Sequence, residues 1–289
     1  MDQPAVTRET IVQGLRRLGL EGGDVVMVHS SLSRFGRVDG GAEAVIEALH
    51  EAVSPGGTVV MSALTITPAF VEAHVRAARE GRIDRAHRVF DVAETPTWAG
   101  RVAETFRLRP DVVRSWHPSH SVTAAGPLAE ELVAGHHLAA ACGRDSPYER
   151  ITRRDDGRIL LLGTSHEVNT TMHGFEELAG VPYVEHPEVC RIPIRTPAGE
   201  TLAETRLHRF HVRRELGRLE GLYITAGAET VTRIGAAPAR LCRAQVLRSI
   251  TLEALEQNPW ALVTPRGRRA WEKMQATGNV FDPPDPAQA

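Results

Sequence analysis

Four short segments of the sequence carry side chains that can move protons or hold a polar part of a substrate. Histidines, hydroxyl residues and carboxylates gather at 29–31, at Thr65, at 117–121 and at 169–177. Histidine suits acid–base work because its ordinary pKa of about 6.5 lies near neutral pH. Hydroxyls and loop amides can hold a phosphate or a polarised carbonyl oxygen. These residue types therefore favour proton transfer on a bound substrate.

The motifs of several common enzyme classes are missing from the sequence. Neither the glycine pattern of dinucleotide-binding loops nor that of nucleotide phosphate loops occurs. The segment 163–167 lacks the second glycine of a serine-hydrolase elbow. His166 and His173 are seven residues apart, which is not the spacing of a zinc-binding helix. Lys273 is the only lysine in the sequence, so lysine chemistry is excluded.

Amphipathic helices alternate with short apolar strands in the first half of the chain. Apolar periodicity predicts a helix over 11–18, a strand over 25–28, a helix over 45–53 and a strand over 58–61. A strand, a helix and a second strand in this order predict a parallel pair of strands. Further helices are expected from a Thr67–Pro68 start and from a cap at Thr97.

The second half continues the alternation. The patterns predict strands over 158–162, 190–194, 222–225 and 230–234, a helix over about 170–179 and a closing helix over 238–255. No repeat, linker or change in composition divides the chain, so we expect a single domain over 1–281 and a disordered tail over 282–289. The expected fold is α/β: a layered α/β/α sandwich around a mostly parallel or mixed sheet. Ligands of such sheets bind at the carboxyl ends of the strands, where the polar segments should converge.

Composition limits the partners of the protein. Of 289 residues, 42% are hydrophobic and 24% charged, and the net charge of −2 argues against nucleic acid as a partner. No segment approaches the roughly 18 apolar residues that span a bilayer, and residues 1–20 include charges where a signal peptide is apolar. Three widely spaced cysteines without a C-x-x-C motif favour a reducing compartment. We expect a cytoplasmic protein.

Taken together, three blocks of residues resemble the aminoglycoside 3-N-acetyltransferase family. The first block is Val28-His29-Ser30-Ser31-Leu32-Ser33 with Gly36, Val38, Gly40-Gly41 and Ser54-Pro55-Gly56-Gly57-Thr58. The second is Phe90-Asp91, Thr95-Pro96 and Arg114-Ser115-Trp116-His117-Pro118 with Ser121, Ala124 and Gly126-Pro127. The third is Ser146-Pro147, Leu160-Leu161-Leu162-Gly163 and Asn169-Thr170-Thr171-Met172-His173, with Glu176 and Val181-Pro182-Tyr183. The similarity runs from Ile11 to about Val263.

The resemblance implies an enzyme that moves an acetyl group directly from acetyl-coenzyme A (acetyl-CoA) to the 3-amino group of an aminoglycoside antibiotic, conferring resistance. It implies that coenzyme A is held by Ser30, Ser31, Ser33, Arg37 and Val38, with Ser121 reaching its pantetheine arm. Because aminoglycosides are polycations, the acceptor site would need carboxylates, for which Asp39, Asp91 and Glu94 are the candidates. No metal is implied, and a homodimer is an open possibility.

The expected base is His173, since an amine must lose a proton to attack a thioester. It falls in the first turn of the helix predicted from about Thr170, where the helix dipole disfavours a positively charged ring. Glu176 and Glu177 lie three and four residues further along, so one of them can orient the imidazole. The resemblance favours Glu176. His29 is either a second polar group at the reaction centre or a strand-end histidine with a structural role.

Two observations leave other functions open. The stretch 206–218 is rich in arginine, which leaves open a biosynthetic or housekeeping acyltransferase for a different small amine. A metal-dependent hydrolase using His117, His120, His166 and His173 is a weaker alternative, because their spacing matches no metal signature. Arg114 either contacts coenzyme phosphates or is a solvated surface residue.

Overall fold

The computed structural model describes residues 5–85, 89–210 and 212–278. Seven strands form the main sheet in the order β4-β5-β2-β1-β6-β10-β9, and three strands form a smaller sheet in the order β3-β7-β8. The strands are β1 (Val25–Ser30), β2 (Thr58–Ser62), β3 (Phe90–Asp91), β4 (Val113–Arg114), β5 (Val122–Ala125), β6 (Gly157–Leu162), β7 (Cys190–Thr196), β8 (Gly199–Thr205), β9 (Glu229–Ile234) and β10 (Ala237–Arg243). The α-helices are α1 (Arg8–Leu18), α2 (Gly41–Ala52), α3 (Pro68–Arg79), α4 (Arg101–Arg107), α5 (Ala129–Val133), α6 (Pro147–Thr152), α7 (Thr171–Leu178), α8 (Glu220–Thr225), α9 (Ala244–Gln257) and α10 (Pro265–Thr277).

The centre of the main sheet is parallel and its edges are antiparallel. Strand β1 pairs in parallel with β2, with Val25 opposite Thr58, and with β6, with Val25 opposite Gly157. The pairs β2–β5, β4–β5, β6–β10 and β9–β10 are antiparallel. The sequence prediction of an α/β fold with a mixed sheet is therefore confirmed, as is the parallel pair of the first two predicted strands.

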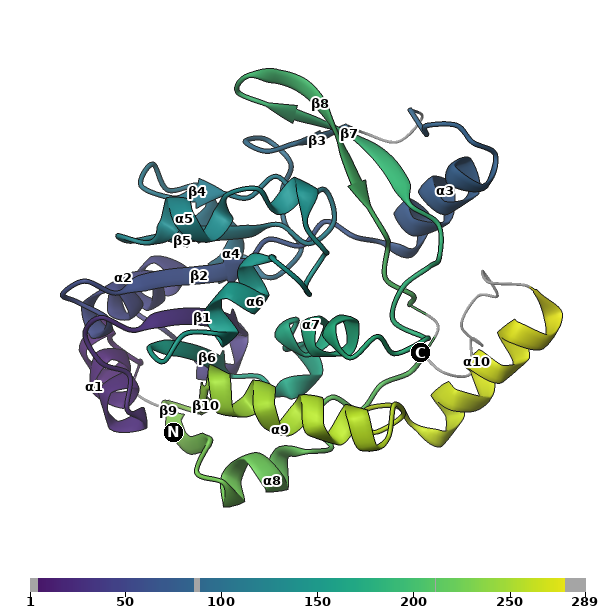
Figure 1. Ribbon diagram of the computed structural model, residues 1–289. Helices are drawn as coiled ribbons and strands as arrows, with labels where there is room; N and C mark the ends of the chain where they lie inside the picture. Colours follow the sequence, from purple (N-terminus) through teal and green to yellow (C-terminus); the bar gives the residue numbers. More distant parts are fainter. Residues whose placement is uncertain (1–4, 86–88, 211, 279–289) are drawn as a thin grey trace.

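Side chains of alternate residues in the central strands pack into two separate apolar cores, one on each face of the sheet, so the fold has three layers (Figure 1). Val26 and Val28 pack with residues of α1, α2 and α4 on one face of the sheet. Val25 and Met27 pack with residues of α5, α6, α7 and α9 on the other face. Strands buried on both faces have continuous apolar sequences, which is why β1 was recognisable from its residues alone.

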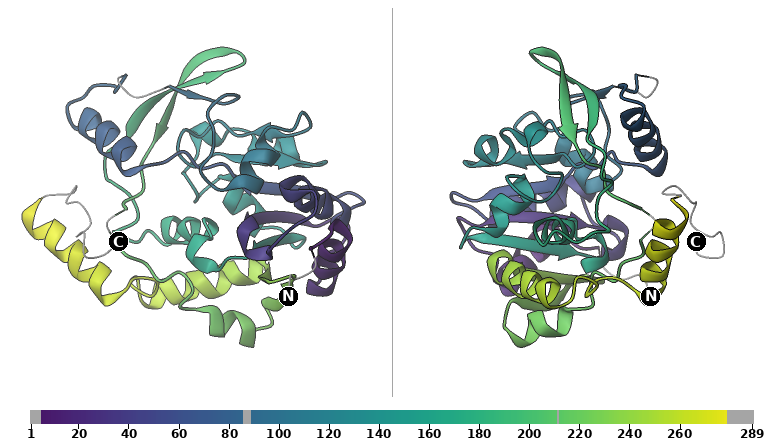
Figure 2. Two further views of the ribbon diagram at one scale, coloured as in Figure 1. Left: turned by 180° about the vertical axis from the view of Figure 1, so that it is seen from behind. Right: turned by 45° about the vertical axis from the view of Figure 1, so that its right-hand side comes forward.

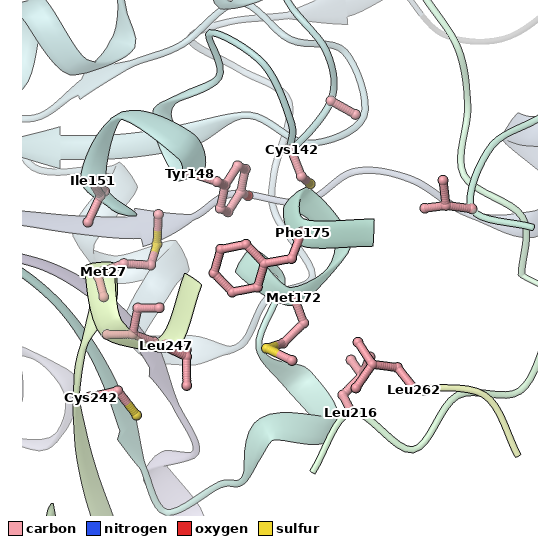
Figure 3. Close-up of a cluster of buried hydrophobic side chains, with 14 of the residues drawn as sticks. Met27, Cys142, Tyr148, Ile151, Met172, Phe175, Leu216, Cys242, Leu247 and Leu262 are labelled. Carbon is pink, nitrogen blue, oxygen red and sulfur yellow. The ribbon is translucent and has the colours of Figure 1, made fainter. Parts of the chain in front are cut away.

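Helix α7 is fixed to the second core by two large apolar side chains. Met172 is fully buried and Phe175 is 1% exposed, and Figure 3 shows both pointing into the cluster that contains Tyr148 and Leu247. These two residues are three apart and share one face of the helix. The helix is consequently held at a fixed position beside the carboxyl end of β6.

The smaller sheet extends away from the main sheet. Strands β7 and β8 form a hairpin with Cys190 opposite Thr205, and the hairpin projects at the top of Figure 1 and in both views of Figure 2. Helix α3 packs against β7 through a cluster that includes Val71, Val75 and Ile192. The chain leaves β8 at Thr205, and Arg214 contacts Glu176 of α7.

Four sequence expectations about elements were wrong or incomplete. The predicted strand over 222–225 is helix α8, where only Tyr223 is buried, so a short apolar run was misread. The predicted helix over 238–255 begins as strand β10, and α9 starts only at Ala244, because 237–243 pairs with β6. Thr97 does not cap a helix, since α4 begins after Gly100. Helix α10 was not predicted.

The tail predicted over 282–289 lies outside the described residues. No helix within the described ranges is both long and apolar enough to cross a membrane.

Candidate active site

A cleft of about 620 Å³ opens at the carboxyl ends of β1 and β6; we call it the strand-end cleft. Its lining includes His29, Ser30, Ser31, Arg34, Trp98, Gly100, Gly163, Thr164, Ser165 and Thr170. The residues come from the ends of two parallel strands and from the loops that follow them. This is the position at which ligands bind in open α/β sheets.

Gly163 lets two of these loops approach closely. Its φ of +69° is rarely adopted by residues with a side chain. A Cβ atom built on Gly163 would lie 2.8 Å from the carbonyl oxygen of Ser31 and 2.8 Å from the Cβ of Arg34. A larger residue would therefore displace the segment 30–34, which contains Ser30, Ser31 and Ser33 and which we call the serine loop.

A smaller hollow of about 450 Å³ adjoins the strand-end cleft. Ser30, Ser31, Ser33 and Val38 line it, together with Gly100 and Arg101. Four of the residues that the resemblance assigned to coenzyme A thus face one continuous surface. Arg34 lines the strand-end cleft, and both Arg34 and Arg101 are exposed cations that sequence reasoning missed.

The other two residues assigned to coenzyme A do not line these cavities. The Arg37 side chain is 82% exposed and its Nε lies 3.6 Å from Oδ1 of Asp39. Ser121 is fully buried, and its hydroxyl donates to the carbonyl oxygen of Ala63 at 2.7 Å. Its oxygen also accepts from Nε of Arg114 at 3.0 Å. Neither expectation is supported by the geometry, because Ser121 is used inside the fold and Arg37 extends into solvent.

A second cleft of about 440 Å³ contains His173; we call it the histidine cleft. Its lining includes His120, Glu167, His173, His208, Arg209, Phe210, Arg213 and Arg214. It shares Leu64, Trp98, Val168 and Thr170 with the strand-end cleft, so the two clefts meet. Trp98 stands at this junction with 55% of its surface exposed, and its Nε1 donates to the carbonyl oxygen of Ile66 at 2.9 Å.

His173 is held by a buried carboxylate. Its Nδ1 lies 2.8 Å from Oε2 of Glu176, which is fully buried, while the His173 side chain is 25% exposed. Arg214 Nε donates to both carboxylate oxygens of Glu176, at 3.0 and 2.9 Å. Of the two glutamates left open by the sequence, Glu176 is the one that contacts His173.

The charge of Glu176 determines the tautomer of His173. Burial raises the pKa of Glu176, but the Arg214 guanidinium and the hydrogen bond from His173 outweigh it and lower that pKa to about 2. An ionised carboxylate only accepts hydrogen bonds, so the shared proton is on Nδ1 of His173. The other ring nitrogen, Nε2, is left free to accept a proton, as a general base requires.

His29 lies at the strand-end cleft with an unused ring nitrogen. The residue is 7% exposed, and its Nε2 has no hydrogen-bond partner among the described residues. Burial, with a smaller contribution from the nearby His166 ring, lowers the pKa of His29 to about 4. A neutral imidazole at this position can donate or accept a hydrogen bond without carrying charge.

Glu177, the second candidate glutamate, has a structural role. Its oxygens accept from the backbone amides of Cys142 and Gly143 at 2.9 Å, and Oε1 lies 2.6 Å from Nε2 of His208. Burial, partly offset by these backbone hydrogen bonds, raises the pKa of Glu177 to about 7. Burial also lowers the pKa of His208 well below its usual value, so that its ring is neutral.

The histidines proposed for a metal-dependent hydrolase do not gather into one set. His117 and His120 are near each other, with ring centroids 6.1 Å apart, but both are buried. In the part of the chain that the structure describes, metal-ligating atoms approach one another in other combinations: His120 with Cys142 and His208, His166 with Glu229 and Cys242, and His208 with Glu177 and Glu185. That hypothesis is therefore wrong as stated.

The acidic residues expected at the acceptor site lie elsewhere. Asp39 pairs with Arg37 near the start of α2. Asp91 is in β3, where its Oδ1 accepts from the backbone amides of Ala93 and Glu94. Neither Asp39, Asp91 nor Glu94 lines any of the three cavities described above.

Arg114 is neither a coenzyme contact nor a solvated residue. It is 8% exposed and, besides Ser121, its guanidinium donates to the carbonyl oxygens of Ala63, Val92 and Thr95. It joins loops that flank the junction of the two clefts. Arg209, Arg213 and Arg214 of the arginine-rich stretch, by contrast, line the histidine cleft.

Comparison with known proteins identifies the family of this chain. The model of the aminoglycoside 3-N-acetyltransferase family matches residues 27–256, which is most of the chain. The chain belongs to this family. Aminoglycoside N(3)-acetyltransferase III of Serratia marcescens is 34% identical over 265 residues, which are 87% of this chain and 98% of the relative. The enzyme of the same name from Acinetobacter baumannii is 39% identical over 178 residues, or 61% of this chain, and the match spans 62% of the length of that relative.

Solved structures of aminoglycoside acetyltransferases have the same fold. A complex of AAC-IIIb with CoASH superposes with a TM-score of 0.76 at 27% identity, covering 91% of this chain and 99% of the other. A variant of AAC(3)-IVa in complex with a gentamicin has a TM-score of 0.76 at 28% identity, covering 93% and 95%. Within this family, one protein thus binds coenzyme A and another binds an aminoglycoside.

Proposed function

We propose that this protein is an acetyl-CoA-dependent N-acetyltransferase that uses His173 as a general base. The observation that carries the proposal is the meeting of the two clefts at Trp98 and Thr170, with His173 on one side and the serine loop on the other. The family supplies the acceptor to test first, the 3-amino group of an aminoglycoside. Acetyl-CoA acts as a co-substrate in the strand-end cleft.

In the proposed reaction, the amine nitrogen bonds to the carbonyl carbon of the acetyl group and the carbon–sulfur bond breaks. The amine gives its proton to Nε2 of His173, and the proton then passes to the departing thiolate, so charge and atoms balance. Glu176 stabilises the imidazolium that forms in between, and Arg214 keeps Glu176 ionised. A general base of this kind contributes ~10²–10⁴ in rate.

Hydrogen-bond donors at the strand-end cleft serve the coenzyme. The Ser30 and Ser31 hydroxyls and Nε2 of His29 are candidates for the thioester carbonyl, where one donor is worth ~10²–10³ in rate. Arg34 and Arg101 are exposed, and no acidic partner for either is found among the described residues, so they are placed to attract coenzyme phosphates.

The test is incubation of the purified protein with acetyl-CoA and either gentamicin or apramycin, following thiol release and product mass. We expect release of one thiol for each acetyl group gained by the antibiotic, with fragment masses that place the acetyl group on the 3-amino nitrogen. Acetylation of a different amino group would support the acetyltransferase activity but reject the 3-amino group as the site of acetylation. Absence of thiol release with every amine would reject the function.

Two further expectations stay predictions. The described cysteines are free and buried, which supports a reducing compartment such as the cytoplasm. A homodimer is untested and is measured by sedimentation of the purified protein.

A further inference from the structure

We propose that the segment 259–267, which leads into α10 and which we call the α10 turn, positions the base His173 by fixing Arg214. The inference rests on the proposed function, because it concerns the base of the same acetyl transfer. The match to the family model ends at residue 256, so the α10 turn lies beyond it. Gly267 is the positioning residue at which the α10 turn comes closest to the backbone next to Arg214.

Arg214 holds Glu176 from one backbone position. Its Nε donates to both carboxylate oxygens of Glu176, at 3.0 and 2.9 Å, and its Nη1 donates to the carbonyl oxygens of Arg209 and Val212 at 3.2 and 3.0 Å. Its guanidinium also lies 5.4 Å from the centre of the Tyr183 ring. These contacts lie in fixed directions around a planar group, so a shift of the Arg214 backbone would disturb its contact with Glu176.

The backbone of residues 213–215 is paired with the α10 turn. Arg214 and Val263 form an antiparallel bridge. Two backbone hydrogen bonds flank this bridge: one of 2.9 Å from the amide of Glu215 to the carbonyl oxygen of Leu262, and one of 3.2 Å from the amide of Thr264 to the carbonyl oxygen of Arg213. The α10 turn therefore determines the position from which the Arg214 side chain reaches α7.

Gly267 brings the first turn of α10 against the same backbone. The Thr264 hydroxyl caps this helix by accepting from the amide of Gly267 at 3.0 Å, and it donates to the carbonyl oxygen of Arg213 at 3.2 Å. A Cβ atom built on Gly267 would lie 2.2 Å from that carbonyl oxygen and 2.9 Å from the Arg213 amide nitrogen. Glycine is less favourable than alanine inside a helix, so the close approach explains its presence here. A larger residue must push Arg213 and α10 apart.

The α10 turn is anchored to the core that also holds α7. Leu262 is fully buried in that apolar cluster (Figure 3). Trp260 stacks on Tyr183 with ring centroids 5.0 Å apart, and the Tyr183 hydroxyl donates to the carbonyl oxygen of Pro259 at 2.9 Å. The ring beside the Arg214 guanidinium and the helix that carries the base thus belong to one packed unit with the α10 turn.

This arrangement predicts an effect on catalysis that leaves coenzyme binding unchanged. Glu176 orients the His173 ring and stabilises the imidazolium, so displacing Arg214 should lower kcat. The structure describes the whole α10 turn, and none of its residues lines the strand-end cleft or the adjoining hollow. KM for acetyl-CoA should therefore stay near its wild-type value.

The first variant is Gly267→Ala, measured by thiol release with acetyl-CoA and the amine that the wild-type protein acetylates fastest, beginning with gentamicin. We expect kcat to fall at least about fivefold and KM for acetyl-CoA to stay within about twofold of wild type. Gly221→Ala is the matched control, because Gly221 lies in the first turn of α8 and an added Cβ would meet nothing within 4 Å. It should retain wild-type kcat.

A double-mutant cycle with Arg214→Ala distinguishes positioning from a general loss of packing. If Gly267 acts through Arg214, then Gly267→Ala should lower kcat by less than about twofold once the Arg214 side chain is absent. A general loosening of the core would lower kcat by the same factor in both backgrounds. The thermal midpoint of each variant shows whether it is folded.

Thr264 provides a second, milder test of the same contact. Thr264→Val keeps the shape of the side chain but removes the hydroxyl that joins Gly267 to Arg213, and it should lower kcat at least about twofold, again only when Arg214 is present. Thr264→Ser keeps the hydroxyl and should retain wild-type kcat.

The outcomes separate this inference from the proposed function. A folded Gly267→Ala protein with wild-type kcat overturns the inference, as does an equal loss of kcat with and without Arg214; in both cases the wild-type protein is active and the transferase function stands. Should Gly267→Ala not fold, a Thr264→Val protein with wild-type kcat overturns the inference in the same way. A wild-type protein that releases no thiol with any amine overturns the transferase function, and the inference with it.

Discussion

Replacing His173 with glutamine should abolish most of the activity while leaving the fold intact. Glutamine can still donate to Glu176, but it has no basic nitrogen, so the amine proton has no acceptor. A lost general base of ~10²–10⁴ in rate corresponds to about 3–5 kcal/mol of the activation barrier. We therefore expect kcat of His173→Gln to fall at least about a hundredfold.

The structure gives reasons to expect little loss of stability. The His173 side chain is one quarter exposed and contacts Glu176 through a single hydrogen bond, whereas Arg214 continues to hold that carboxylate. The apolar anchors of the helix, Met172 and Phe175, are untouched. The thermal midpoint should change by only a few degrees, since about 1 kcal/mol shifts a large domain by roughly 2–4 °C.

The assay is steady-state thiol release at saturating acetyl-CoA with the best acceptor, and His137→Gln is the matched control. His137 is also partly exposed, packs against Trp116 with ring centroids 5.3 Å apart, and lines none of the three cavities. It should retain wild-type kcat. A folded His173→Gln protein within about threefold of wild type would refute the assignment and move the base elsewhere, with His29 the next candidate.

Two other predictions concern the partners of this histidine and the coenzyme. Glu176→Gln should lower kcat less than His173→Gln does. The Glu176 pKa falls from 4.5 to about 2 on folding, so the ionised carboxylate stabilises the wild-type protein by on the order of 3 kcal/mol above pH 4.5, and this stabilisation is lost as the pH falls toward 2. The free energy of unfolding of the Glu176→Gln variant should therefore depend less on pH between 4.5 and 2 than that of the wild type. An equal pH dependence of the free energy of unfolding in the two proteins would contradict the lowered pKa of Glu176. Gly163→Ala should raise KM for acetyl-CoA with a smaller effect on KM for the amine, because its Cβ would press on the Ser31 carbonyl oxygen; an unchanged KM for acetyl-CoA would argue against a coenzyme at this loop.

The elements that carry the site were predictable where the signal is local. An uninterrupted apolar strand followed by His29 and Ser30 marked the end of β1, and the three-residue spacing of His173 and Glu176 placed them on one helix face. Both signals need only a few neighbouring residues. The histidine cleft itself was not predictable, because Arg214 lies 38 residues beyond Glu176 and reaches it only after the excursion through β7 and β8.

The errors have the same physical origin. The acidic residues Asp39, Asp91 and Glu94 were grouped by chemical type, but Asp91 belongs to the smaller sheet and Asp39 to the loop before α2. The segment 237–243 has the composition of a helix start, yet it is a strand because β6 and β9 offer hydrogen bonds on both sides. Tertiary pairing decides such segments, and it is not encoded in their local pattern.

The most direct test of direct acetyl transfer is the intact mass of the protein after incubation with acetyl-CoA, with and without acceptor. The three cysteines are buried and burial raises their thiol pKa, so no cysteine is prepared to carry the acetyl group, and the proposed base His173 would act on the amine directly. We predict unmodified protein in both samples, no thiol release without the amine, and one acetylated amine for each thiol released with it. A stoichiometric acetyl-protein that forms without the amine and disappears on its addition would contradict the account.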